Sequence, residues 1–279
     1  MAGRRRKKSG GRSYAWRYRG RIVACVFVEV IIICALVIMI GWNKGVKEWF
    51  EQFEQPVLKE VDISGINSPN AILMQARGGK ILGEINGEAQ IYPASMTKIM
   101  TVILGIENFD DLDEKITLTN EMFTGLYEQD ATQAGFQPGE EVRVIDLLYG
   151  AMLPSGAECC IALADTISGS EADFAELMNK KARKLGMENT NFCDSTGLHN
   201  PDHYSTVKDI AVLMKYCIKN DTFREIVETS RHSTGVTNIH PDGITYYSTM
   251  FKNLSDPTVT GGKILGGKTG YTSEAGTVW

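Results

Sequence analysis

Residues 92–104 read Tyr-Pro-Ala-Ser-Met-Thr-Lys-Ile-Met-Thr-Val-Ile-Leu, and the rest of the chain is organised around them. A proline ahead of a small hydroxyl residue, followed by an apolar run, is typical of a helix N-terminus, so Ser95 is predicted in the first turn. Lys98 follows one turn later on the same face, within hydrogen-bond reach of Ser95. Since an amine in an apolar environment gives up its proton more readily, this pair predicts a serine nucleophile with a lysine base.

The same four residues also fit an ordinary helix start with a solvated lysine. S-x-x-K alone does not distinguish a catalytic pair from an ordinary helix start, so the choice depends on the rest of the chain.

The N-terminal part of the chain predicts a membrane anchor. Residues 1–21 are strongly basic, and residues 22–41 form an apolar run of bilayer length. Glu29 is the one charge in this run and costs about 3 kcal/mol, whereas the apolar side chains together contribute about −5 kcal/mol. We therefore expect a cytoplasmic tail at 1–21, a transmembrane signal anchor at 22–41, a stalk at 42–60 and an extracellular domain at 61–279.

A cleaved signal peptide is the alternative for the apolar run, but the run is long and no small-x-small site follows it closely. The adjacent anchor argues that the basic tail lies at the cytoplasmic membrane surface and does not bind nucleic acid. The 279 residues include six cysteines, but no C-x-x-C. No metal and no other cofactor is therefore predicted, and the disulfide state stays open.

Beyond the stalk, the pattern predicts an α+β domain. Residues 71–85 read as a β-hairpin turned by Gly78 and Gly79, because a glycine pair allows the positive φ of a tight turn. Helices are predicted at 142–153, 158–167, 174–185 and 207–218, and strands at 263–270 and 275–279. An early hairpin, a helical block and late strands predict one antiparallel sheet shared by the early and late strands, beside a mostly helical lobe.

Three ordered motifs link this domain to a known family. Ser95-Met96-Thr97-Lys98, Ser155-Gly156-Ala157 and Lys268-Thr269-Gly270 follow the order S-x-x-K, S-x-N and K-T-G of penicillin-recognising serine enzymes. With the text between them, the chain from about Asn70 to its last residue resembles serine-type D-alanyl-D-alanine carboxypeptidases, the low-molecular-mass penicillin-binding proteins. The resemblance implies a β-lactamase/transpeptidase-like fold.

This resemblance also implies a role for each motif residue. Ser95 would attack the carbonyl between the two terminal D-alanines of a peptidoglycan stem peptide, Lys98 would take its proton, and Ser155 would relay protons to the leaving amine. β-Lactams would be covalent inhibitors.

The third motif would bind the substrate. Lys268 and Thr269 would hold the terminal carboxylate, and Gly270 would leave room for the peptide along the strand. The backbone N–H groups of Ser95 and Tyr271 would form the oxyanion hole.

Ala157 departs from the family pattern, which has Asn at this position. A methyl group cannot replace the amide, and losing such a charge-assisted contact costs about 1.5–3 kcal/mol. Glu158 is adjacent but cannot donate when ionised. Three explanations stay open: an active variant compensated elsewhere, a slow enzyme, or a catalytically weak or inactive protein that binds wall peptides or β-lactams on the same scaffold.

Two other mechanisms are less well supported by the sequence. A class A β-lactamase needs a glutamate on a loop between the second and third motifs, and Glu176 lies in a helical pattern instead. His199 and His203 suggest a serine–histidine mechanism, but Lys98 already supplies a base, so we expect both histidines to order their loop. Asp194 and Asp202 are expected to form turns.

The resemblance carries one more expectation, about the end of the domain. In relatives, further strands and a helix follow the K-T-G strand, so the domain is expected to be incomplete at its C-terminus. We therefore expect residues 57–279 alone to have low stability.

Overall fold

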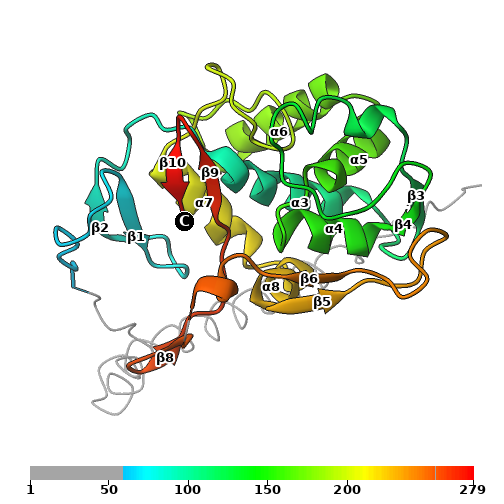
Figure 1. The fold of residues 1–279 in the computed structure, drawn as a ribbon. Coiled ribbons are helices and arrows are strands. Elements are labelled where there is room, and N and C mark those ends of the chain that lie inside the picture. The colour runs from blue at the N-terminus through cyan, green and yellow to red at the C-terminus, as the bar shows by residue number, and fades with distance from the viewer. Residues whose placement is uncertain (1–58, 255) are drawn as a thin grey trace, which may run out of the picture. The chain divides into compact units, whose positions relative to one another are not determined.

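The predicted hairpin lies near the start of the region that the computed structural model describes, residues 59–254 and 256–279 (Figure 1). Strands β1 (Ala71–Met74) and β2 (Ile81–Ile85) pair antiparallel, as predicted. Gly78 and Gly79 turn the chain between them with φ of +92° and +80°. The glycine pair is needed there, because side chains disfavour this backbone conformation.

The predicted anchor at 22–41 and nearly all of the predicted stalk at 42–60 lie outside the described residues. Among the helices that the structure does describe, none is long and apolar enough to cross a bilayer.

A block of helices follows the hairpin and contains most of the core. The helices are α3 (Lys98–Asn108), α4 (Val144–Met152), α5 (Ala157–Ser168), α6 (Glu171–Leu185), α7 (Val207–Cys217) and α8 (Asp221–Glu228). Figure 1 shows α3, in teal, beside α4 and α5, in green, and apolar residues of all three are fully buried in one cluster. The apolar spacing that predicted helices here therefore marks the face of each helix that packs inward.

One helix boundary differs from the prediction because residues at the predicted helix start pair in a strand instead. The helix predicted at 142–153 begins at Val144, because Val142 pairs with Ile116 between the short strands β4 (Glu141–Arg143) and β3 (Lys115–Thr117). Helix α7 begins at Val207, as predicted, and the side chain of Thr206 caps it by accepting a hydrogen bond from the Asp209 N–H.

The sequence did not predict α8 or the hairpin of β5 (Arg231–Ser233) and β6 (Thr245–Tyr247). This hairpin packs on α4 through polar contacts. His232 Nε2 lies 2.8 Å from Asp146 Oδ1, and its ring stacks on Tyr149 at 3.7 Å between centroids.

The prediction of one sheet shared by early and late strands is wrong for the described residues. Their strands form five separate two-stranded pairs. β1 pairs with β2, while β9 (Gly270–Thr272) pairs with β10 (Gly276–Val278). The α+β class is nevertheless correct, and the strand predicted at 275–279 is present as β10.

The strand predicted at 263–270 is also wrong in extent, because Lys263 ends the short strand β8 (Gly262–Lys263), which pairs with β7 (Thr258–Val259), and β9 begins only at Gly270. The backbone of Gly266 lies against Val227 at the end of α8, and a Cβ on Gly267 would lie 2.5 Å from Met250 Sδ. These residues pack against a helix and a side chain, so they have no strand partner.

Candidate active site

Ser95 lies in a tight turn that leads directly into the central helix. Residues Ala94–Thr97 form the 3₁₀ turn η1, and Lys98 opens α3. Lys98 Nζ donates a hydrogen bond of 3.1 Å to Ser95 Oγ, so the reach that the sequence predicted is confirmed. Ala94 has a φ of +46°, which is strained for a residue with a side chain.

A loop far along the chain supplies the second partner of Lys98. Lys98 is 4% exposed, and its Nζ donates to the carbonyl oxygen of Thr196 at 2.6 Å. Asp194 Oδ1 shapes this loop by accepting from the N–H groups of Thr196 and Gly197, both at 2.7 Å. Burial opposes ionisation of Asp194, but hydrogen bonds from His203, Thr196 and Gly197 outweigh it and lower its pKa to about 2. The expected turn-forming role of Asp194 is thus confirmed.

Ser155 stands between α4 and α5 and extends the polar chain. Its Oγ donates to Ser95 Oγ at 3.0 Å and accepts from Lys268 Nζ at 2.9 Å. The φ of Ser155 is +73°, a left-handed conformation that is unusual for serine. Lys98, Ser95, Ser155 and Lys268 therefore form one continuous hydrogen-bonded chain, although the sequence separates them by up to 173 positions.

Lys268 is buried beside a second lysine. Its side chain also donates to the Thr269 carbonyl oxygen at 2.7 Å. Burial, and then the nearby charge of Lys98, lower the pKa of Lys268 to about 7. An amine with this pKa is only partly protonated near neutral pH. A group that binds beside it can therefore shift the balance between its charged and neutral forms.

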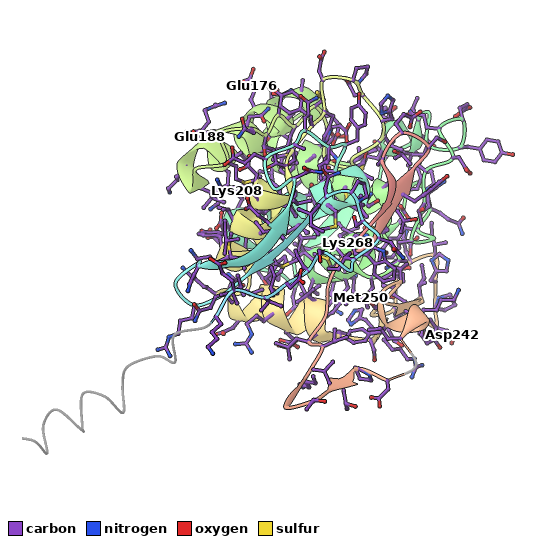
Figure 2. The ribbon with its side chains drawn as sticks, turned by 90° about the vertical axis from the view of Figure 1, so that its left-hand side faces the viewer. Glu176, Glu188, Lys208, Asp242, Met250 and Lys268 are labelled. Atoms are coloured by element: carbon purple, nitrogen blue, oxygen red, sulfur yellow. The ribbon has the colours of Figure 1, made fainter. Side chains whose placement is uncertain are left out.

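The rest of the third motif runs past the Ser95 turn. A Cβ on Gly270 would lie 2.8 Å from the backbone nitrogen of Ser95, so only glycine allows this close approach. Thr269 Oγ1 is hydrogen-bonded to Thr249 Oγ1 at 2.7 Å, and the side chain of Tyr271 is exposed. Met250, labelled with Lys268 in Figure 2, packs against Gly267, the residue before Lys268.

Ala157, the departure from the family pattern, is the first residue of α5 and is buried. Its N–H donates to the Thr132 carbonyl oxygen at 2.8 Å, and its methyl group offers Lys98 no hydrogen bond. Glu158 does not replace the missing amide, because its Oε1 accepts from the N–H groups of Ala134 and Gly135.

The two histidines order the loop, as expected. His203 is buried, and its Nε2 lies 2.9 Å from Thr97 Oγ1 in the Ser95 turn. The ring of His199 contacts Tyr92 edge to face at 4.8 Å, and its Nδ1 lies 3.8 Å from Glu274 Oε2. Among the described residues, neither histidine has a recorded hydrogen bond to Ser95.

The sequence did not identify Thr196 and Thr249 as residues of this site. The Asp-Ser-Thr-Gly order at 194–197 predicts a turn, but no local pattern predicts that the Thr196 carbonyl receives Lys98. Within the described part of the chain, no group of three or more metal-ligating side chains comes together.

Comparisons with known proteins show the family of this chain. A family model described as D-alanyl-D-alanine carboxypeptidase matches residues 57–279. The chain is 38% identical over 164 residues to the D-alanyl-D-alanine carboxypeptidase DacF of Bacillus subtilis, covering 57% of this chain and 41% of that protein. It is 35% identical over 209 residues to DacC of Escherichia coli, covering 66% and 51%. It thus spans about half the length of the curated relatives it matches.

Solved structures with a similar fold are also found. A Streptomyces DD-transpeptidase superposes with a TM-score of 0.67 and 28% identity, covering 79% of this chain and 85% of that one. Penicillin binding protein 5 from Haemophilus influenzae superposes with a TM-score of 0.66 and 27% identity, covering 78% and 61%.

Proposed function

This chain belongs to the D-alanyl-D-alanine carboxypeptidase family of peptidases, and we propose that it hydrolyses the bond between the two terminal D-alanines of peptidoglycan stem peptides. The observation that carries this proposal is the hydrogen-bonded chain of Lys98, Ser95, Ser155 and Lys268. It connects a nucleophile, a base, a proton relay and a cation for a substrate carboxylate.

In the acylation step, Ser95 Oγ attacks the carbonyl carbon of the penultimate D-alanine. Lys98 Nζ, in its neutral form, takes the hydroxyl proton across the 3.1 Å contact. As the C–N bond breaks, a proton passes through Ser155 to the nitrogen of the departing D-alanine. The enzyme is left as an ester on Ser95.

In the second step, water attacks the ester carbonyl and Lys98 accepts its proton. The ester bond to Ser95 breaks, Ser95 regains a proton and the shortened stem peptide leaves as a carboxylic acid. No metal or organic cofactor takes part in either proposed step.

Groups along β9 and η1 would bind the substrate. The ammonium of Lys268 and the hydroxyl of Thr269 would hold the terminal carboxylate, and Gly270 would let the peptide lie along the strand. The backbone N–H groups of Ser95 and Tyr271 would stabilise the oxyanion. The close approach of Gly270 to the Ser95 nitrogen supports this assignment.

We place the reaction on the outer side of the cytoplasmic membrane. Residues 61–279 would be the catalytic domain, held by the apolar segment 22–41 and the stalk 42–60, with the basic tail 1–21 inside the cell. The partners would be stem peptides ending in D-Ala-D-Ala, the membrane and, as covalent inhibitors, β-lactams, with no role for nucleic acid.

Free D-alanine released from a diacyl peptide ending in D-Ala-D-Ala tests the proposal, together with labelling by a fluorescent penicillin. The native chain should do both, and Ser95→Ala should do neither, because the acyl-enzyme cannot form. A native chain that folds but is not labelled would refute the enzyme reading.

Ala157 favours one alternative, a protein that binds wall peptides or β-lactams with little or no turnover. In that case labelling by penicillin would occur, but no D-alanine would be released under conditions in which a relative releases it.

A further inference from the structure

Glu158 is a fully buried carboxyl group that the proposed mechanism does not use. It lies in the first turn of α5, three residues after Ser155, and is 0% exposed. Its Oε1 accepts hydrogen bonds from the backbone N–H groups of Ala134 at 2.6 Å and Gly135 at 2.9 Å. One oxygen of this side chain therefore attaches a distant loop to the start of α5.

The same loop contacts the second motif at two further points. The Thr132 carbonyl oxygen accepts from the Ala157 N–H at 2.8 Å. A Cβ on Gly156 would lie 2.7 Å from the Cβ of Ala134, so the loop and the motif are packed closely together. Residues 132–135 thus run alongside Gly156, Ala157 and Glu158.

Ser155, next to these contacts, needs such support. Its φ of +73° is a conformation that serine leaves unless its surroundings hold it. Its Oγ has to stay between Ser95 Oγ at 3.0 Å and Lys268 Nζ at 2.9 Å for the hydrogen-bonded chain to remain continuous. The loop that packs on the following residues limits the rotation of this corner.

We propose that Glu158 is a positioning residue for the acylation of Ser95, because its carboxyl group holds residues 132–135 against the second motif and so keeps Ser155 in place. This inference rests on the proposed function. In this inference Glu158 does not replace the amide that is missing at position 157. It acts on the backbone of a loop, whereas the amide would act on Lys98.

The charge of Glu158 is not needed for this role. Oε2 is buried and has no hydrogen-bond partner among the described residues, and burial raises the pKa of the carboxyl group. Both N–H groups bind the same oxygen, Oε1. An amide oxygen can accept the same two hydrogen bonds, so glutamine should replace glutamate here, whereas alanine should not.

The test measures the second-order rate constant for acylation by a fluorescent penicillin in the full chain, with the reactive fraction counted by mass spectrometry. Glu158→Ala should slow acylation by on the order of 10- to 100-fold, the effect of a small displacement of a reacting group. Glu158→Gln should stay within about threefold of the native rate. Glu158→Asp keeps the acid but is one methylene shorter, and should lie between them.

Glu140 provides a matched control. It is also 0% exposed and accepts hydrogen bonds from Thr237, His240 and the Gln137 N–H, away from Ser155. Glu140→Ala should lower the melting temperature as Glu158→Ala does, but acylation per folded molecule should change less than about threefold. If Glu158→Ala does not fold, Glu158→Asp is compared with Glu140→Asp.

Three results would overturn the inference: a native acylation rate in Glu158→Ala, equal slowing in the Glu158 and Glu140 variants, or equal slowing in Glu158→Gln and Glu158→Ala. Each of these requires that the native chain is acylated. They are therefore distinct from a native chain that is not labelled, which would refute the proposed function itself.

Discussion

The two walls of the Ser95 site are built differently. The helical wall, formed by η1, α3 and α5, stands on the buried core, where residues such as Ile103 and Leu163 are fully enclosed. The strand wall, residues 264–279, exposes large side chains, with Leu265 46% and Tyr271 70% accessible. In the described part of the chain, β9 has only β10 as a strand partner.

Lys268 is the exception on the strand wall, because its ammonium is buried against Ser155 of the helical wall. In the proposed mechanism, the core thus holds the nucleophile and the proton relay, while a lightly packed segment supplies the cation for the substrate. From this difference we expect changes in the helical wall to alter both folding stability and acylation. Changes in the strand wall should alter acylation with little effect on stability.

The largest expected difference is in stability, between two leucines. Leu163→Ala in α5 should lower the free energy of unfolding by about 2–5 kcal/mol, because it leaves a cavity in the core. Leu265→Ala in the strand wall should cost less than about 1 kcal/mol, since that side chain is already half exposed. Urea denaturation of the full chain measures both values. Similar losses would contradict the contrast between the two walls.

Lys268→Ala should show the opposite pattern, a large loss of acylation with no loss of stability. Acylation by penicillin should fall by about 100-fold, because a charge-assisted contact with the carboxylate is lost. The melting temperature should hold or rise, since removing a buried amine relieves a desolvation cost. The control is Lys263→Ala, one residue before the strand wall, because this side chain is exposed and its removal should not change the acylation rate. A large loss of stability in Lys268→Ala would count against a lightly packed wall.

Ala157→Asn tests whether the helical wall lacks a contact that an amide at position 157 would supply. The amide should add a contact to Lys98 and to the substrate, and acylation should rise by about tenfold. Ala157→Leu adds bulk without an amide and should give no gain, and because Ala157 is buried both melting temperatures should be recorded. Unchanged acylation in a folded Ala157→Asn would mean that the native site already compensates for the missing amide.

The smallest effect concerns pH. Because the pKa of Lys268 is lowered to about 7, its side chain is a cation below that pH and neutral above it. Binding of a carboxylate needs the cation, so Lys268 should contribute a fall in acylation of about fivefold between pH 7 and pH 8. This falling limb should be absent in Lys268→Ala and with a β-lactam whose carboxylate is esterified. A limb that persists in both would have to come from another group.

Local patterns in the chain predicted much of this architecture. The glycine pair at 78–79 sets the hairpin turn, because few other residues adopt positive φ easily. Apolar spacing predicted α3 to α7 within a few residues, and the pairing of Ser95 with Lys98 follows from one helical turn. Such features depend on neighbours in the sequence, so they can be predicted without knowing the fold.

The remaining features depend on residues that are distant in sequence. The Thr196 carbonyl meets Lys98, and the loop at Ala134 meets Glu158, only after the core has packed. The low pKa of Lys268 depends on burial beside another lysine, which no local pattern records.

The prediction of a shared sheet failed for the same reason. Strands β2 and β9 are 185 residues apart in the sequence, and such strands share a sheet only if their edges meet in space. The motifs therefore predicted the four side chains of the hydrogen-bonded chain, because the chemistry of each motif is local to it. Packing determined the hydrogen bonds and charge states of those residues, because both depend on distance and burial in the folded chain.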